Sequence, residues 1–232
     1  MTTIRRVGHK GADHIAPGNT LASFDAALRA RVDMIEFDVL PRGSELVLAH
    51  DEAHAGPDAL TLEEGLAHLA ADAFAGIELD VDLKLPGYEE RVVAALRAHG
   101  LVERTLVSTL FMRSLVAVRR LEPRVRLGWS VPRIRRDYML SPILRIPAYA
   151  GLLRMRWRLP AVASEHIRAG RCDALMAHWR LVTPRLVRTL ETAGGELYVW
   201  TVDDAARIRR LEDMGVTGVI TNDPRLFVPR QA

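Results

Sequence analysis

Acidic side chains alternate with apolar ones in two short runs of this chain of 232 residues. Glu36 and Asp38 stand in MIEFDVL, and Asp80 and Asp82 stand in ELDVDL, which Lys84 follows. If each run is a β-strand, its alternate side chains share one face, so the acidic groups point the same way. Converging carboxylates are costly to bury without a cation, and Mg²⁺ or Ca²⁺ prefers carboxylate oxygens as ligands. The pattern therefore predicts a site for one divalent cation, with salt-bridged or capping carboxylates as the alternative.

Two histidines stand near strand ends and add proton chemistry to these carboxylates. His9 follows the first apolar run and precedes Lys10, and His50 ends another apolar run. Imidazole accepts and donates protons near neutral pH, as general acid–base catalysis requires. Hydrolysis of a phosphodiester needs a base for the nucleophile, an acid for the leaving alkoxide and cations against the phosphoryl oxygens. Lys10, Lys84 and a bound metal would supply that positive charge.

The elements that must position these residues follow from the order of apolar runs and helical stretches. Eight runs predict parallel strands, at 5–7, 34–40, 77–83, 105–108, 125–130, 174–177, 197–202 and 216–221. The spacing of apolar residues predicts helices between most of them, the first at 20–30 with Asn19 as its N-cap. Eight such repeats predict one domain over 1–232, a single (β/α)8 TIM-type barrel, with an open doubly wound sheet as the alternative. In a barrel, the C-terminal ends of the strands form the catalytic face.

Two segments depart from this repeat. The apolar run at 46–49 comes too soon after the strand at 34–40 for a parallel crossover, so it predicts an extra hairpin strand. Residues 132–171 are too many for an ordinary strand-to-helix loop and predict a long loop insertion, in which arginines alternate with Leu, Ile, Met, Tyr and Trp. Because this insertion follows a strand, we expect it to lie over or beside the catalytic face.

Composition limits the classes of protein to consider. A net charge of +3 is too small to indicate nucleic-acid binding, and no predicted strand is followed by a glycine-rich nucleotide-binding motif. Cys172 is the only cysteine, which excludes an intramolecular disulfide and a cysteine zinc cluster and favours a reducing compartment. The first residues lack the apolar core of a signal peptide, and no run of about 18 apolar residues occurs. We expect a cytoplasmic protein that acts on a small molecule.

A series of short motifs resembles, in order, those of the glycerophosphodiester phosphodiesterase family. They are GHKG, APGNTLASF, IEFDV, LAHDE, LTLEEGL, DLKLPG, VSTL, YVWTVDD and GVTGVITNDP, and only 132–171 lies largely outside them. The resemblance implies a TIM barrel and the hydrolysis of a glycerophosphodiester to an alcohol and glycerol phosphate. It also implies dependence on a divalent metal, Mg²⁺ or Ca²⁺, and acid/base catalysis by histidine.

The resemblance assigns the proton chemistry and the metal to particular residues. His9 and His50 match the family's acid/base pair. Glu36 and Asp38 match two of its metal ligands, and Asp82 falls where the family usually has a glutamate that also binds metal. Because aspartate is one methylene shorter than glutamate, we expect the ion to sit closer to the strand that carries Asp82.

Two further positions match residues that bind phosphate or substrate in the family, and two others depart from the family's motifs. Lys84 matches a lysine near the phosphate and the metal, and Trp200 matches an aromatic residue at the substrate end of the pocket, with a core aromatic as the alternative. Lys10 replaces the arginine of the usual HRG, so phosphate would meet a point charge instead of a bidentate fork. Gly18 replaces the glutamate of the usual PENT, so any role of that acid is absent.

The mouth of the barrel differs from the family pattern as well. The stretch between Asp51 and Glu78 is too short for the capping subdomain that the family commonly inserts there, so we expect 132–171 to replace it and to govern which alcohol or acyl group is accepted. One alternative is a lysophospholipase D-type enzyme that contacts a membrane surface through 132–158. We prefer to interpret that segment as a basic lid or a packed helix. Another is a catalytically inactive barrel that binds phosphate-bearing ligands. The sequence predicts no oligomeric state and no particular alcohol.

Overall fold

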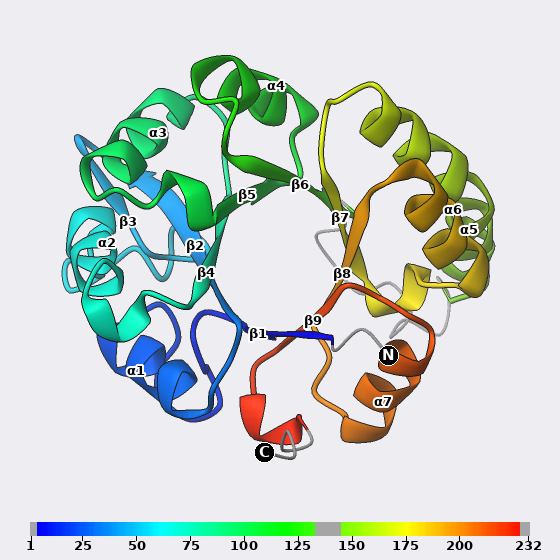
Figure 1. Cartoon of the computed structure of the whole chain (residues 1–232), viewed down its shortest axis with the longest axis horizontal. Helices are drawn as coiled ribbons and strands as arrows, with labels where there is room; N and C mark the ends of the chain where they lie inside the picture. Colours follow the sequence, from blue (N-terminus) through cyan, green and yellow to red (C-terminus); the bar gives the residue numbers. More distant parts are fainter. Residues whose placement is uncertain (1–3, 133–144, 228–232) are drawn as a thin grey trace.

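Eight parallel strands close into a ring that is surrounded by helices (Figure 1). The computed structural model describes residues 4–132 and 145–227, except for the side chains of 145–148. The ring consists of β1 (Arg5–Gly8), β2 (Met34–Arg42), β4 (Glu78–Leu83), β5 (Thr105–Thr109), β6 (Arg126–Val131), β7 (Ala174–His178), β8 (Glu196–Trp200) and β9 (Gly218–Thr221). Strand β1 pairs in parallel with both β2 and β9, which closes the sheet. The predicted TIM-type barrel is therefore confirmed, and the open doubly wound sheet is wrong.

One further strand, β3 (Glu45–Val47), lies outside the ring and runs antiparallel to β2. Leu40 pairs in register with Val47, and only two residues link the strands. Gly43, the first of the two, has a φ of 58°, a left-handed conformation that glycine adopts without steric cost. This pairing confirms the extra hairpin strand.

The helices cover the outer side of the ring (Figure 1). They are α1 (Leu21–Arg29), α2 (Leu62–Leu69), α3 (Glu89–Ala98), α4 (Met112–Leu121), α5 (Arg145–Arg168), α6 (Pro184–Ala193) and α7 (Ala205–Asp213), with a 3-10 turn η4 (Trp179–Leu181) after β7. Apolar stripes on these helices, such as the one that contains Leu66, Leu96 or Leu190, are buried against the outward faces of the strands. The main core therefore lies between ring and helices.

The start of α1 differs from the prediction. Thr20, and not Asn19, is the N-cap: its hydroxyl accepts a hydrogen bond from the backbone N–H of Ser23 at 3.2 Å, and its own N–H donates to Oγ of Ser23 at 3.2 Å. Asn19 has a φ of 60°, a left-handed conformation that asparagine tolerates better than most residues. This backbone turn frees the Asn19 amide for a contact with β2.

Much of the segment predicted as a long loop is helix α5. This helix packs against α6 and contacts η4, so it is the helix of the repeat between β6 and β7 and lies on the outer wall of the barrel (Figure 1). The expectation of a loop is therefore wrong for Arg145–Arg168, where the alternative of a packed helix holds, and a position beside the catalytic face stays a prediction. Residues 133–144 of the predicted insertion lie outside the described residues.

Four charged side chains close the end of the barrel that is opposite the catalytic face. Arg5, Glu78, Arg126 and Glu196 begin β1, β4, β6 and β8, which are alternate strands of the ring. Arg5 lies 2.6 Å from Glu196 and Arg126 lies 2.6 Å from Glu78, and the crossed pairs lie at 3.5 and 3.2 Å. Layers of four side chains from alternate strands are the usual filling of such barrels. We call these four residues the basal ring.

Candidate active site

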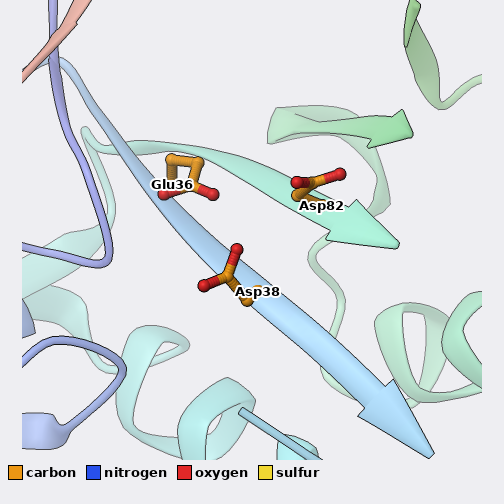
Figure 2. Close-up of side chains that lie close together, drawn as sticks. All are labelled: Glu36, Asp38 and Asp82. Atoms are coloured by element: carbon orange, nitrogen blue, oxygen red, sulfur yellow. The ribbon is translucent and has the colours of Figure 1, made fainter. Parts of the chain in front are cut away.

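Strands β2 and β4 bring three carboxylates together, with Asp82 near the C-terminal end of β4 and Glu36 and Asp38 in the part of β2 that pairs with β4. Asp38 pairs in register with Asp82, and Glu36 precedes Asp38 by two residues on the same face of β2. One ligand oxygen from each residue lies within 4.8 Å of the other two. Figure 2 shows Glu36 and Asp38 on one strand and Asp82 on its neighbour. The three residues predicted as metal ligands therefore form one group, which we call the acidic cluster.

Lys84 supplies positive charge to the acidic cluster. Its ammonium group pairs with Asp38 and lies 2.5 Å from Oδ2 of Asp82. Burial disfavours the charged form of Lys84, but Asp82 and Asp38 raise its pKa well above the usual value. Burial also opposes ionisation of Asp38, yet Lys84 and His9 hold the pKa of Asp38 below its usual range. Lys84 and Asp38 therefore form a buried pair in which both groups are charged.

Glu36 is the member of the acidic cluster that Lys84 neutralises least. Its side chain is only 5% exposed, and burial followed by the charge of Asp38 raises its pKa well above the usual value. A divalent cation between the three carboxylates would remove this repulsion, and carboxylate oxygens are the ligands that Mg²⁺ and Ca²⁺ prefer. The donor set therefore fits the ion that the sequence predicted.

Asp80 lies deeper in the barrel than Asp82, two residues earlier on β4, and is fully buried. Burial raises the pKa of Asp80 to about 8, and the neighbouring Ser108 opposes the shift. The carboxyl is therefore protonated at neutral pH, unlike that of Asp38. The alternating sequence pattern by itself did not distinguish Asp80 from Asp82.

His9 lies at the end of β1 beside Glu36. Its Nε2 is 3.8 Å from Oε2 of Glu36, and its Nδ1 is 2.5 Å from Oδ1 of Asn222. Burial lowers the pKa of His9, although the charge of Asp38 opposes this shift. A neutral imidazole in this position is able to accept a proton. Sequence reasoning missed Asn222, although it stands in the motif GVTGVITNDP.

Two residues before α1 hold the carboxylates of β2 in place. The backbone N–H of Lys10 donates to Oε2 of Glu36 at 2.8 Å. Asn19 donates from Nδ2 to Oδ2 of Asp38 at 3.0 Å and accepts from the Asp38 backbone N–H at 3.1 Å. Sequence reasoning missed this role of Asn19 because asparagine before a helix also fits a cap.

Comparison with known proteins places this barrel in a family. The family model described as the glycerophosphoryl diester phosphodiesterase family matches residues 9–56 and 60–226. The chain belongs to this family. Its sequence is 25% identical to a glycerophosphodiester phosphodiesterase of Caldanaerobacter subterraneus over 96% of this chain and 95% of the relative. It is 24% identical to one of Bacillus subtilis, over 97% and 85%. The resemblance and the predicted enzyme class, a phosphoric diester hydrolase, are thereby confirmed.

Solved structures from other organisms share the barrel. A glycerophosphodiester phosphodiesterase from Parabacteroides distasonis has a TM-score of 0.72 at 20% identity, covering 96% of this chain and 94% of that protein. A phosphodiesterase from Oleispira antarctica, in complex with the product sn-glycerol-3-phosphate, has a TM-score of 0.71 at 20% identity, covering 95% and 94%. At these identities the likeness shows a common fold.

The glycerophosphodiester phosphodiesterase motif is broken at Gly18, and the structure shows what fills the space. The Gly18 N–H donates to Oδ1 of Asp13 at 2.8 Å, and Nζ of Lys10 lies 3.7 Å from Oδ2 of Asp13. A Cβ at position 18 would lie 2.6 Å from Oδ1 of Asp13 and 2.8 Å from Cβ of Lys10. A glutamate there would displace the Lys10–Asp13 pair, so the departures at Lys10 and Gly18 are structurally linked.

Trp200 lies on β8, across the ring from β4 (Figure 1). Its indole N–H donates to the carbonyl of Met176 at 2.8 Å, and its ring meets His178 edge-on with 5.3 Å between centroids. Both side chains are half-buried at strand ends. The role of Trp200 in substrate binding stays a prediction. His178 is a second residue of the mouth, and its only signal in the sequence is its place after an apolar run.

His50 stands apart from the acidic cluster in this member of the family. It follows β3, its side chain is 54% exposed, and its Nδ1 lies 3.3 Å from Oδ2 of Asp51. Within the described ranges, no hydrogen bond or ion pair joins His50 to the acidic cluster or to His9. The structure therefore places His9 beside the predicted metal ligands, while the role of His50 stays a prediction.

Proposed function

We propose that this chain hydrolyses glycerophosphodiesters to an alcohol and glycerol phosphate, with one divalent cation, Mg²⁺ or Ca²⁺, at the acidic cluster. The observation that carries the proposal is the grouping of three carboxylate oxygens within 4.8 Å of one another, next to His9 and Lys84. Family membership supports the reaction class. The complex of the Oleispira antarctica protein with sn-glycerol-3-phosphate supports glycerol phosphate as a product.

Positive charge for the phosphate comes from several groups in this proposal. Glu36, Asp38 and Asp82 would hold the cation, which when bound neutralises charge on the phosphoryl oxygens. Lys84 keeps its charge inside the site, and Lys10 brings a second ammonium group whose present partner, Asp13, is 3.7 Å away. A lysine pairs with phosphate as a point charge and lacks the two-pronged geometry of arginine. We therefore expect Lys10 to attract the phosphate group of the substrate without fixing its orientation.

Proton transfer is assigned to His9 and His50. One imidazole takes a proton from the attacking water as the water oxygen bonds to phosphorus. The other gives a proton to the alkoxide as the P–O bond to the alcohol breaks. The sum is the addition of one water across that bond, and exchange with solvent restores both histidines. Trp200 would contact the organic part of the substrate.

A panel of phosphodiesters tests the proposal. Glycerol phosphate release would be measured from glycerophosphocholine, glycerophosphoethanolamine and glycerophosphoglycerol, after EDTA treatment and after re-addition of Mg²⁺, Mn²⁺ or Ca²⁺. We expect no turnover without metal and recovery with at least one ion. Asp82→Asn should weaken the metal response, whereas Asp58→Asn, an exposed residue outside the acidic cluster, should not. Full turnover by metal-free protein would contradict the proposal, and ligand binding without any turnover would favour the inactive barrel.

Action on lysophospholipids is a second candidate, favoured by helix α5. Tyr149, Leu153 and Trp157 are 51%, 45% and 68% exposed and recur every four residues, so they form one apolar stripe. Arg154 and Arg158 are exposed beside them. A stripe of aromatic and basic residues suits the surface of an anionic membrane. No helix within the described ranges is both long and apolar enough to cross a membrane.

The two candidates differ in the substrate that is turned over fastest. The same metal and histidines would act on a soluble glycerophosphodiester or on a lysophospholipid presented in vesicles. Parallel assays of glycerophosphocholine and lysophosphatidylcholine, at matched concentrations and with the activating metal, would separate them. A higher kcat/KM for the lysolipid would favour the second candidate.

A further inference from the structure

Asn222 contacts the ring of His9 at the catalytic face, and Asp203, which follows the neighbouring strand, holds Asn222 in turn. Its Nδ1 lies 2.5 Å from Oδ1 of Asn222, which follows β9. Asn222 donates from Nδ2 to Oδ2 of Asp203 at 2.7 Å and from its backbone N–H to Oδ1 of Asp203 at 2.9 Å. The hydroxyl of Thr221 donates to the same Oδ1 at 3.0 Å. Asp203, which comes shortly after β8, therefore accepts hydrogen bonds from both the backbone and the side chain of Asn222.

The orientation of the Asn222 amide follows from the chemistry of its neighbours. Carboxylate oxygens only accept hydrogen bonds, so the part of Asn222 that faces Asp203 must be its NH₂ group. Its carbonyl oxygen then faces His9, and a carbonyl oxygen also only accepts. The proton in the contact between Asn222 and His9 must therefore be on Nδ1 of His9.

We infer that Asn222 and Asp203 are positioning residues, which keep a proton on Nδ1 of His9, so that Nε2 is the ring nitrogen that accepts a proton. Nε2 is the nitrogen on the side of Glu36, and its distance of 3.8 Å from Oε2 is too long for a hydrogen bond. This inference rests on the proposed function and extends it. It makes His9 the base of the acid/base pair and leaves the acid to His50.

In this role, Nε2 of His9 takes a proton from the attacking water as the O–H bond breaks and the water oxygen bonds to phosphorus. The imidazolium that results has one proton on each nitrogen. The Nδ1 proton stays in the contact with Asn222, and the new proton is on Nε2, the nitrogen on the side of Glu36. A ring in the other tautomer would present Nε2–H to the water and could not act as its base.

The tautomer itself is measurable by ¹⁵N NMR of protein labelled at histidine, because protonated and bare ring nitrogens resonate far apart. The His9 signals would be assigned by their loss in His9→Gln. We expect Nδ1–H in the unmutated chain at a pH where His9 is neutral. In Asp203→Asn the Asn222 amide is free to turn over, so we expect a mixture that includes the Nε2–H form.

Asp204→Asn is the matched control for Asp203→Asn. Asp204 is the next residue, is also exposed, and caps α7 by accepting from the Arg207 N–H at 2.6 Å. Asparagine caps a helix as well as aspartate does, so this variant loses the same charge without losing the cap. We expect it to keep both the Nδ1–H tautomer and the kcat of the unmutated enzyme.

Kinetics test whether the tautomer matters for turnover, with the best substrate and metal from the panel. Asn222→Ala should lower kcat by about tenfold to a hundredfold, the usual effect of losing a residue that orients a functional histidine. Asp203→Asn should lower kcat less, and neither should change KM much, because the affected step is proton transfer. Thermal unfolding would confirm that each variant is folded.

Two results would overturn the inference. One is an Nε2–H tautomer in the unmutated chain, and the other is an Asp203→Asn variant whose spectrum and kcat equal those of Asp204→Asn. Neither result would by itself contradict the proposed function. The proposed function would fail if the unmutated enzyme showed no turnover, or showed turnover without metal. The tautomer is read without substrate, so it decides the inference in either case.

Discussion

At the scale of single residues, similar carboxyl groups in one barrel have different charge states. Asp38 is ionised beside Lys84, Glu36 resists ionisation, and Asp80 is protonated at neutral pH because burial raises its pKa to about 8. The difference comes from distance to one ammonium group and from depth in the barrel. Lys84 pairs with Asp38 and not with Glu36. Glu36 and Asp38 therefore become equivalent ligands only when a bound cation compensates the negative charge of Glu36.

The histidines give the first prediction at this scale. Replacement of His9 or His50 by alanine should lower kcat by about a hundredfold or more, the usual scale for loss of a general acid or base. His54→Ala is the control for His50, because His54 also contacts Asp51, at 2.6 Å, and is also exposed. We expect His54→Ala to keep its activity. A rate within about threefold of the unmutated enzyme for both His9→Ala and His50→Ala would show that the assignment is wrong.

At the scale of elements, one buried carboxylate joins the end of α4 to its neighbours. Glu122, the C-cap residue of α4, accepts from Nε of Arg124 at 2.8 Å and from Nε of Arg97 on α3 at 2.9 Å. These two guanidinium groups, Arg124 first, hold the pKa of Glu122 near 2, below its ordinary value of 4.5. While it is charged, the Glu122 carboxylate forms ion pairs with Arg97 on α3 and with Arg124 before β6, and so links these two elements.

The sign of this shift gives a pH prediction. Because the pKa of Glu122 is lower in the folded chain, its contribution to stability is complete above about pH 4.5 and disappears as the pH falls towards 2. Glu122→Gln should therefore lower the melting temperature at pH 7, and the difference from the unmutated chain should shrink between pH 4.5 and 2. Thermal unfolding followed by circular dichroism across this range measures it. A difference that stays constant with pH would contradict the assignment.

Helix α5 carries a prediction about membranes. Burying a Leu or aromatic side chain is worth roughly 1.5–3 kcal/mol, so loss of both Leu153 and Trp157 should weaken partition into anionic vesicles at least about tenfold. Higher salt should also weaken binding, because Arg154 and Arg158 contribute by charge. Vesicle sedimentation measures both effects, with Leu21→Ala on α1 as a control at an exposed apolar residue. Equal binding of the double variant and the unmutated chain would exclude the stripe as the contact.

At the scale of the whole molecule, the candidate active site and the stabilising basal ring lie at opposite ends of the barrel. The acidic cluster and His9 lie at the C-terminal ends of the strands, and the basal ring lies at the N-terminal ends. The side chains of the basal ring are about one third exposed or less, and each arginine faces two glutamates. Their charges alternate around the ring, so removing one glutamate leaves two guanidinium groups without enough compensation.

Glu196→Gln should therefore destabilise the fold without changing the active site. We expect the free energy of unfolding to fall by about 1–3 kcal/mol, because Arg5 and Arg126 both lose a charged partner. Values of kcat and KM for folded protein should stay the same, since the basal ring is at the other end of the barrel. Glu191→Gln, at an exposed position on α6, is the control. A large change in KM with unchanged stability would contradict this separation.

The sequence by itself determined the repeating fold and the shared face of the carboxylates. Alternation in MIEFDVL and ELDVDL is a local property, so it predicted that the carboxylates of each run share a face before any strand pairing was known. The family resemblance then assigned Glu36, Asp38 and Asp82, and not Asp80, as ligands. Apolar periodicity likewise gave the eight strands and the hairpin strand. The motif order gave the family, because it survives the departures at Lys10 and Gly18.

Only the tertiary structure decided which groups touch across the chain. Helix α5 contains Pro160, which argues locally against a helix, and packing against α6 stabilises it. The contact between His9 and Asn222 joins residues 213 positions apart, and its geometry depends on Asp203 after another strand. Such contacts leave no periodic signal in the sequence. They arise because closing the barrel brings β1 and β9 side by side and so sets the protonation of His9.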